Sequence, residues 1–272
     1  MMSLFRHSLA YADGFGYGPA MSTELTPTDT TTHFGFTEVA EGDKESLVRD
    51  VFDSVASKYD LMNDLMSMGI HRLWKNTMLD MLRPKAGMDL VDVGGGTGDI
   101  AFRFLDRGGS SVRVVDINNE MLTHGRRRAI DQGRLEGIDW INGDAEKLPI
   151  ETGSADAYTT AFCIRNVTHI DRALEEAARV LKPGGRFMCL EFSHIALPAL
   201  ERIYDTYSFS VLPWLGEIVA NDRDSYQYLA ESIRQFPTQA RFADMIGKAG
   251  LAQVTYRNLS GGIAAIHSGW RI

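Results

Sequence analysis

The sequence has few of the residues that mark secreted, metal-binding or membrane-spanning proteins. Its 272 residues include only 2 cysteines, Cys163 and Cys189, which are far apart and form no Cys-x-x-Cys pair. This spacing indicates neither a dense disulfide framework nor a thiolate metal site, and a reducing compartment is the simplest interpretation. No apolar run reaches the roughly 18–20 residues of a membrane-spanning helix. The longest such run, residues 207–220, is interrupted by Pro213 and Gly216.

Positive charge is also scarce. The chain carries 28 Lys and Arg residues against 36 Asp and Glu residues, for a formal net charge of −8. An acidic balance disfavours broad nucleic-acid binding, and we expect no nucleic-acid partner. The one dense basic cluster, Arg126-Arg127-Arg128, lies in a helical pattern and is interpreted as a solvated face. No pattern in the sequence predicts a metal site.

The hydrophobic content of 44% is sufficient for one sizeable domain. Residues 1–42 are rich in Gly, Thr and Ser without a sustained period, and we predict a disordered leader there. Apolar residues at helical spacing begin after Asp43. We therefore predict a single domain over 43–272, with N-terminal helices (43–83) and a helical insertion (about 196–240) that cover a pocket.

Strands and helices alternate from Asp89 onward, which predicts βαβ units and an α/β fold. The expected architecture is a seven-stranded, mostly parallel sheet with helices on both faces and an antiparallel strand from a C-terminal hairpin. The predicted helices are 71–82, 98–107, 119–131 and 170–181, and the predicted strands are 89–93, 111–117, 138–144, 155–162, 186–192, 251–259 and 262–270.

A glycine-rich turn follows the first of these strands, where residues 91–99 read VDVGGGTGD. A dinucleotide site of the form G-x-G-x-x-G would need a third glycine where Asp99 stands, and that carboxylate would meet the pyrophosphate. A P-loop would need a G-K-[ST] sequence, which is absent. The spacing of Gly94, Gly96 and Gly98 instead resembles motif I of the class I S-adenosylmethionine-dependent methyltransferases.

Acidic residues follow the next strands in an order that suits S-adenosylmethionine. Asp116 ends the second strand, where its carboxylate would accept hydrogen bonds from ribose hydroxyls. Asp144 ends the third strand and Ala145 follows it, near the place of the adenine. Asp92 or Asp99 would orient the ammonium group. Because the carboxyl ends of parallel strands meet at one edge, these groups are predicted to line one crevice.

Several further stretches resemble a more specific family, the ubiquinone/menaquinone biosynthesis C-methyltransferases. The resemblance extends over roughly residues 43–272. It implies methyl transfer to a ring carbon of a polyprenylated benzoquinol, or of demethylmenaquinol. The stretches that carry it are YDLMNDLMSMGIHRLW (59–74), the motif Phe162-x-Ile164-Arg165-Asn166-Val167, RVLKPGGRFMCLEFS (179–193), Asn221-Asp222-Arg223 and Tyr226-x-Tyr228-Leu229-x-Glu231-Ser232.

The resemblance also implies that Gly94, Thr97, Asp116, Asp144 and Ala145 line the donor site. Two departures concern this region: Cys163 stands where many members have glycine, and Ala161 stands where a serine is often found. The first adds bulk beside the proposed catalytic loop, and the second affects one donor-site hydrogen bond. The residues predicted to bind the donor are Asp92, Gly94, Gly96, Thr97, Gly98, Asp116, Ile117, Asp144, Ala145 and Ala161.

Methylation of a ring carbon needs an electron-rich quinol and a group that stabilises its deprotonated oxygen. Arg165 and Asn166 are the candidates, because a fixed cation would favour the quinolate and an amide would bond to ring oxygens. A surface ion pair is the alternative role for Arg165. Tyr59 is predicted to close over the pocket, and His71 is interpreted as a hydrogen-bonded core histidine rather than a base. The sequence identifies no group that removes the ring proton.

An apolar wall for an isoprenoid tail is predicted from the methionines of 62–68 and from 203–220, with a dimer interface or plain core as the alternative. We expect peripheral membrane contact, a possible homodimer and a quinone-biosynthesis complex. The expected location is the bacterial cytoplasm beside the inner membrane, or else the mitochondrial matrix. Three other functions stay open: an NAD-dependent oxidoreductase, a non-catalytic subunit of such a complex, and methylation of another lipid or phenol.

Overall fold

A computed structural model describes residues 30–55, 64, 67, 69–195, 214, 217 and 223–272. The chain divides into two compact units, Met1–Thr30 and Thr31–Ile272, and every described helix and strand belongs to the second.

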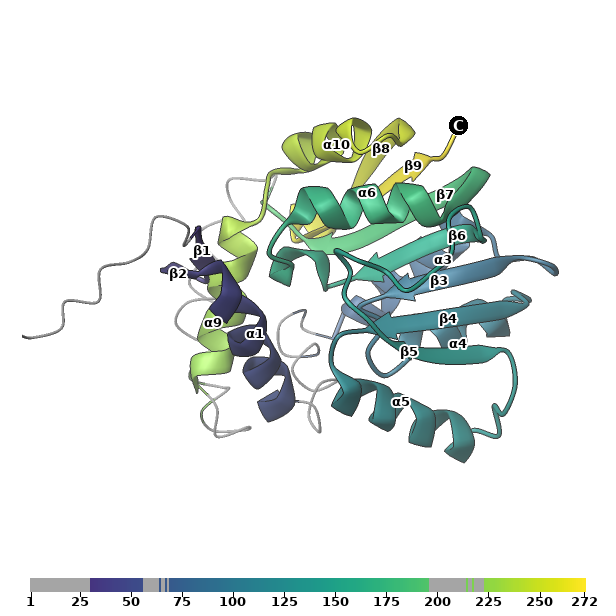
Figure 1. The fold of residues 1–272 in the computed structure, drawn as a ribbon, viewed down its shortest axis with the longest axis horizontal. Helices are drawn as coiled ribbons and strands as arrows, with labels where there is room; N and C mark the ends of the chain where they lie inside the picture. Colours follow the sequence, from purple (N-terminus) through teal and green to yellow (C-terminus); the bar gives the residue numbers. More distant parts are fainter. Residues whose placement is uncertain are drawn as a thin grey trace, which may run out of the picture. The chain divides into compact units, whose positions relative to one another are not determined.

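Seven strands of the described chain form one sheet, in the order β5-β4-β3-β6-β7-β9-β8 (Figure 1). Neighbouring strands from β5 to β7 are parallel, whereas β9 runs antiparallel to both β7 and β8. This confirms the predicted mostly parallel sheet with an antiparallel strand from a C-terminal hairpin. The strands are β3 (Asp89–Val93), β4 (Ser111–Asp116), β5 (Ile138–Asn142), β6 (Ala155–Ala161), β7 (Leu181–Phe192), β8 (Ala252–Leu259) and β9 (Ala264–Trp270).

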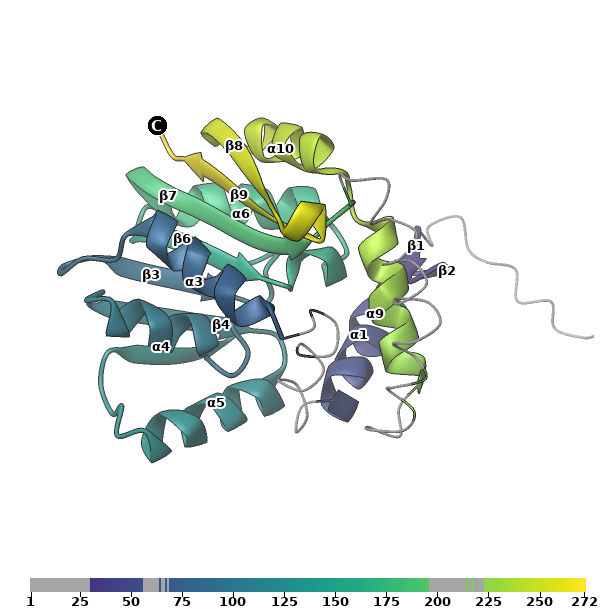
Figure 2. The same cartoon turned by 180° about the vertical axis from the view of Figure 1, so that it is seen from behind.

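Helices cover both faces of this sheet (Figures 1 and 2). Consecutive strand residues point to opposite faces, so Leu90 packs in one apolar layer and Val91 in the other. Because both layers are apolar, the sequences of the buried strands are nearly continuous runs of hydrophobic residues. The helices of the first layer are α3 (His71–Leu82), α4 (Asp99–Asp106) and α5 (Asn119–Asp131), and those of the second are α6 (Ile170–Val180) and α10 (Gln239–Lys248).

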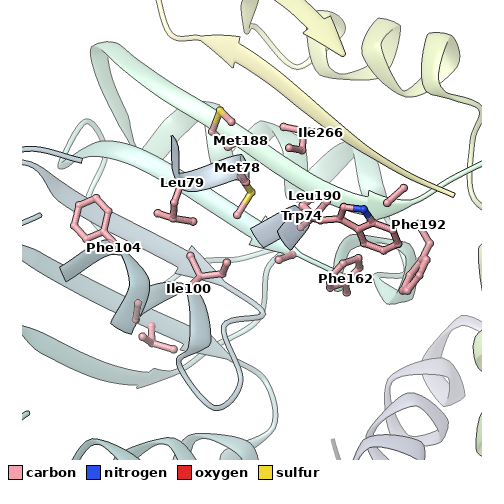
Figure 3. Close-up of a cluster of buried hydrophobic side chains, with 14 of the residues drawn as sticks. Trp74, Met78, Leu79, Ile100, Phe104, Phe162, Met188, Leu190, Phe192 and Ile266 are labelled. Atoms are coloured by element: carbon pink, nitrogen blue, oxygen red, sulfur yellow. The ribbon is translucent and has the colours of Figure 1, made fainter. Parts of the chain in front are cut away.

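The first layer contains a dense aromatic and methionine cluster between α3, α4 and the sheet (Figure 3). Trp74 meets the ring of Phe192 edge-on, with ring centroids 6.0 Å apart. Met78 and Phe104 are fully buried in the same cluster. This packing fixes α3 and α4 against the sheet, and with them the glycine turn from which α4 begins.

The N-terminal part of the unit forms a cover beside the sheet. It consists of β1 (Thr31–Phe34), β2 (Thr37–Ala40) and α1 (Glu41–Val55), and α1 lies beside α9 (Arg223–Gln235) in both views (Figures 1 and 2). Phe34 stacks on Tyr228 of α9 with ring centroids 4.1 Å apart. The backbone N–H of Phe36 donates to Glu231 at 3.0 Å. Segments distant in sequence therefore build one cover.

Two sequence predictions need correction. The prediction of a disordered leader over 1–42 is wrong for residues 31–42, which form the β1–β2 hairpin and the start of α1. Each strand has only 4 residues, too few to show a period, and the hairpin is closed by Gly35 at φ 57°. The strand predicted at 186–192 begins earlier, at Leu181, and β7 has a register shift near this start in its pairing to β6.

Candidate active site

A pocket lies at the carboxyl ends of β3, β4, β5 and β6. In the sheet, β4 lies on one side of β3 and β6 lies on the other side. The pocket therefore lies at the point where the strand order reverses. Open α/β sheets bind their ligands at such a point. The described lining residues come from α1 (Glu45, Val48, Arg49, Phe52), from the strand ends and the residues after them (Val93, Gly94, Gly96, Asp116, Ile117, Asn118, Gly143, Asp144, Ala145, Glu146), from α5 (Met121) and from the segment after β6 (Phe162, Cys163, Asn166, Val167, Thr168).

The glycine turn brings bare backbone to this pocket. Gly94 and Gly96 adopt φ values of 64° and 51°, in the left-handed region that favours glycine. A Cβ on Gly94 would lie 2.1 Å from the Sγ atom of Cys163. A Cβ on Gly98 would lie 2.6 Å from the Trp140 ring, and Gly98 is not among the lining residues. Two of the three predicted glycines therefore line the pocket, and the third allows close packing of Trp140.

Asp116 anchors the opposite wall. Its Oδ2 atom accepts the Gly96 N–H at 2.9 Å, and its Oδ1 atom accepts the Asn118 N–H at 2.8 Å. Burial raises the pKa of this carboxyl to about 6, although both N–H groups oppose that shift. Each carboxylate oxygen has a second lone pair, so two acceptor positions are left for a ligand. The Asn118 side chain caps α5 by accepting the Met121 N–H at 3.1 Å.

The two carboxylates considered for an ammonium group differ in structure. Asp92 is buried beneath the turn, since a Cβ on Gly95 would lie 2.7 Å from its Oδ2 atom. Its Oδ1 atom accepts the Thr159 hydroxyl at 2.7 Å, and no described residue donates to Oδ2. Burial raises the pKa of Asp92 to about 7.

Asp99, by contrast, is already paired with two cations. Its carboxylate accepts from Lys75 at 2.9 Å and from Arg103 at 3.0 Å. Burial raises the pKa of Asp99, but the two cations outweigh it and bring the value down to about 2. Asp99 therefore holds α3 to α4 and is not among the residues that line the pocket.

The predicted catalytic pair lies in a short 3₁₀ turn, η2 (Ile164–Asn166), after β6. The Arg165 side chain is 2% exposed and pairs with Glu191 Oε1 at 2.7 Å. It also donates to the Phe162 carbonyl at 2.8 Å and to the Ser232 hydroxyl at 3.3 Å. Arg165 is thus neither a surface ion pair nor a lining residue of the pocket.

Asn166, the next residue, does line the pocket. Its Oδ1 atom accepts the Tyr228 hydroxyl at 3.0 Å. Its Nδ2 atom is buried and meets no acceptor among the described residues. Burial raises the pKa of Tyr228 well above its usual range, so the phenol keeps its proton and acts as the donor. The amide of Asn166 is thereby left with a free N–H donor in the pocket wall.

Polar contacts tie α1 to the rim of the pocket. Lys44 donates to the Val167 carbonyl at 3.1 Å. His169 lies between two carboxylates, with Nδ1 2.7 Å from Glu146 and Nε2 3.3 Å from Glu41. The amphipathic pattern of α1 was visible in the sequence, but its spacing does not reveal which residues face a ligand.

The structure brings most of the predicted donor site together. His71 is buried with its Nε2 atom 3.0 Å from Asp64, as expected for a core histidine. Tyr59 lies outside the described residues. The predicted residues that line the pocket are Gly94, Gly96, Asp116, Ile117, Asp144, Ala145 and Asn166. The predicted residues that are not among its described lining are Asp92, Thr97, Gly98, Ala161 and Arg165. Lining residues that the sequence analysis did not assign include Asn118, Gly143, Glu146, Val167 and Thr168.

The sheet order, the inserted antiparallel strand and the glycine turn define the fold of the class I S-adenosylmethionine-dependent methyltransferases. A solved S-adenosylmethionine-dependent methyltransferase from Thermotoga maritima, described as a possible histamine N-methyltransferase, shares this fold. The TM-score is 0.60 at 20% identity, over 82% of this chain and 99% of that one.

The chain belongs to the ubiE/COQ5 methyltransferase family, whose model matches residues 40–271. It is 58% identical over 246 residues to the ubiquinone/menaquinone biosynthesis C-methyltransferase UbiE of Cereibacter sphaeroides, covering 90% of this chain and 98% of the relative. It is 53% identical over 278 residues to the mitochondrial 2-methoxy-6-polyprenyl-1,4-benzoquinol methylase of Bos taurus, covering 89% of this chain and 84% of the relative. The family predicted from the sequence is confirmed, and the protein is a methyltransferase.

Proposed function

We propose that the protein transfers a methyl group from S-adenosylmethionine to a ring carbon of a polyprenylated benzoquinol, of demethylmenaquinol, or of both. The names of the relatives support this substrate class. The observation that carries the proposal is the free amide N–H of Asn166 in the wall of a pocket shared with Gly96 and Asp116.

The residues of the pocket fit the methyl donor. Gly94 and Gly96 leave backbone bare where an amino acid moiety would approach, and Asp116 has lone pairs for ribose hydroxyls. The unpartnered Oδ2 atom of Asp92, beneath the turn, supplies negative charge for an ammonium group above it. When bound, S-adenosylmethionine supplies an electrophilic methyl group on a sulfonium.

Asn166 stabilises the acceptor. Loss of the quinol proton raises the electron density of the neighbouring ring carbon and leaves charge on the oxygen. An amide N–H aimed at that oxygen contributes roughly 3–4 kcal/mol to the transition state in comparable sites. Because Tyr228 occupies the amide oxygen, the nitrogen of Asn166 is the group that is free to donate.

Arg165 has a positioning role in this proposal. Its charge is balanced by Glu191, and its Nε and Nη1 groups donate within the fold, so it adds little free positive charge at the ring. It instead fixes the turn that carries Asn166. Tyr59 stays a predicted catalytic residue, and the group that takes the ring proton is not assigned.

We further propose contact with a membrane surface, because a polyprenylated substrate resides there. None of the described helices is long and apolar enough to cross a membrane. Trp214, in the stretch predicted to hold the tail, is 53% exposed. Bacterial and mitochondrial relatives favour a bacterial cytoplasm or a mitochondrial matrix. A homodimer and a quinone-biosynthesis complex stay predictions.

An anaerobic assay tests the function. The full chain is incubated with isotopically labelled S-adenosylmethionine and either reduced demethylated benzoquinol or demethylmenaquinol, and product mass is read. We expect one labelled methyl group on a ring carbon of a quinol and none on the oxidised quinone. Absence of product from both quinols would contradict the proposal and leave a non-catalytic subunit or another phenol substrate.

The role of Tyr228 is tested in the same assay. Tyr228→Phe frees the Asn166 amide to rotate, so kcat should fall about tenfold, which corresponds to about 1.4 kcal/mol, with donor affinity unchanged. Tyr256→Phe is the control, because Tyr256 is 45% exposed on β8. Equal kcat values for Tyr228→Phe and the wild type would remove the amide orientation from the mechanism.

A further inference from the structure

A second concave site lies at the other end of the sheet. This groove has a volume of about 980 Å³ and runs between the end of α3, the start of β3 and the neighbouring strands β6, β7, β8 and β9. Met88 at the groove and Gly94 at the donor pocket flank opposite ends of β3. At about 3.3 Å per residue they are on the order of 20 Å apart. The groove is therefore separate from the methyl-transfer site.

Positive charge gathers in the groove, although the whole chain carries −8. Its two acidic side chains are already engaged: Asp156 accepts from Lys182 at 2.8 Å, and Asp80 pairs at 3.1 Å with an arginine outside the groove. Lys85 also helps to lower the pKa of Asp156, but no described carboxylate forms a salt bridge with any of the remaining cations of the groove. The basic residues that line the groove are Arg83, Lys85, Lys182, Arg186 and Arg257.

Arg186 is held in place but not fully bonded. Its Nη1 group donates to the Met81 carbonyl at the end of α3, and its guanidinium lies 5.0 Å from the centroid of the Trp270 ring. Its Nε–H is buried and meets no acceptor among the described residues. Burial, and after it the nearby Arg83 guanidinium, lowers the pKa of Arg186. Two guanidinium groups thus lie near each other with no described carboxylate paired to either, an arrangement that an anion would stabilise.

The backbone of Arg83 strengthens this interpretation. Arg83 follows α3 at φ 59° and ψ 66°, and its N–H donates to Leu79 at 2.9 Å. Glycine is the usual residue at this left-handed position, and a side chain there costs roughly 1–2 kcal/mol. The strained residue lines the same groove as Arg186.

We propose that the groove is a binding site for a phosphate group, held between Arg83 and Arg186 with Lys85 and Arg257 beside it. Guanidinium forks match phosphate oxygens in pairs, and ammonium groups add charge. A soluble phosphorylated molecule and the headgroup of an anionic lipid present the same chemistry. The site does not depend on the proposed methylation of quinols, because no lining residue of the donor pocket contributes to it.

The experiment titrates inorganic pyrophosphate into the full chain by calorimetry at low ionic strength. We expect saturable binding that weakens as salt rises. Arg83→Gly should weaken it at least tenfold while the melting temperature stays equal or rises, because backbone strain is relieved. Arg83→Gln should weaken binding equally, but its melting temperature should not rise, because the left-handed backbone still carries a side chain. Arg127→Gln is the charge-matched control on the exposed face of α5 and should bind as the wild type does.

Sedimentation with vesicles of phosphatidic acid and phosphatidylcholine, compared with pure phosphatidylcholine, separates the two sources. If the wild type co-sediments with the phosphatidic acid vesicles and Arg83→Gly does not, the ligand is a lipid headgroup. If the wild type binds pyrophosphate but does not co-sediment, the ligand is a soluble phosphorylated molecule. The proposal is overturned if neither probe binds, if Arg83→Gly binds both as the wild type does, or if Arg127→Gln loses as much binding. Methyl transfer should be unchanged in all three variants.

Discussion

At the scale of single residues, the protonation of Asp116 makes the pocket at the carboxyl ends of β3 to β6 sensitive to pH. Its carboxyl is buried, its pKa is raised to about 6, and two backbone N–H groups bond to it. A raised pKa means that the folded state binds the proton more tightly than the unfolded chain does. This group therefore favours folding below its ordinary pKa and loses that contribution as pH rises through about 6.

Donor binding should have the opposite pH dependence. Ribose hydroxyls donate to the ionised carboxylate, so affinity for S-adenosylhomocysteine should fall as pH decreases below about 6, with proton release on binding near that pH. Calorimetry between pH 5 and 8 in buffers of different ionisation enthalpy measures both effects. Asp116→Asn should bind S-adenosylhomocysteine weakly, and its affinity should show no inflection near pH 6. Asp92→Asn should keep that inflection. An unchanged inflection in Asp116→Asn would assign it to another group.

Gly96 tests the need for bare backbone. A Cβ there would lie 3.1 Å from the Met121 methyl and 3.8 Å from the Asp116 carboxylate. Gly96→Val should abolish donor binding and cost about 1–2 kcal/mol of stability through its left-handed backbone. Gly108→Val is the matched control, since Gly108 has φ 89° and open space around its Cβ position. If Gly96→Val bound S-adenosylhomocysteine with wild-type affinity in calorimetry, the proposed need for bare backbone at Gly96 would be refuted.

At the scale of elements, the turn η2 depends on a buried ion pair that joins it to β7. Arg165 and Glu191 are 2% and 1% exposed, and Arg165 also reaches Ser232 on α9. Burial raises the pKa of Glu191, which Arg165 opposes. Arg165 and its partners therefore connect η2, the sheet and a helix of the cover.

Removing one partner of this pair should be costly. Glu191→Gln leaves a buried guanidinium without its counter-charge and should lower the free energy of unfolding by about 3–5 kcal/mol. Urea denaturation measures this loss. Asp244→Asn, which breaks the exposed pair with Lys248, should cost less than about 0.5 kcal/mol. A loss for Glu191→Gln as small as that of the control would show that the pair is not structural.

The sequence predicted helices and strands well where their apolar pattern is strong and they pack directly on the main sheet. The strand at 89–93 and the helix at 71–82 match β3 and α3, because both have strong apolar patterns. The hairpin at 31–40 was missed because its strands are short and pack on a distant helix. The direction of the Arg165 side chain was also missed, since it depends on Glu191, 26 residues away, which only the fold brings near.

At the scale of the whole unit, two chemically different sites occupy opposite ends of one sheet. The donor pocket collects residues from four strand ends and from α1, and the basic groove collects residues from α3 and five strands or their ends. The resemblance of the sequence identified the family correctly. It did not predict the groove, because its cations are dispersed along the chain and meet only in the folded sheet.

Donor binding should stabilise the whole unit. S-adenosylhomocysteine at about 100 times its Kd contributes about 2.7 kcal/mol, and the melting temperature should rise by about 5–10 °C. Scanning calorimetry or a dye-based melt measures the shift. NADH is the comparison ligand and should give none. Stabilisation by NADH alone would favour an oxidoreductase on the same fold.

The position of β9 has a consequence for synthesis of the chain. β8 is made before β9, yet β9 lies between β7 and β8 and is the only described strand to which β8 pairs. A chain that ends before Ala264 therefore leaves β8 without a described strand to pair with, and β7 lacks its neighbour on that side. Such a truncated chain exposes hydrogen-bonding edges on β7 and β8 at once, and bare strand edges of this kind favour aggregation.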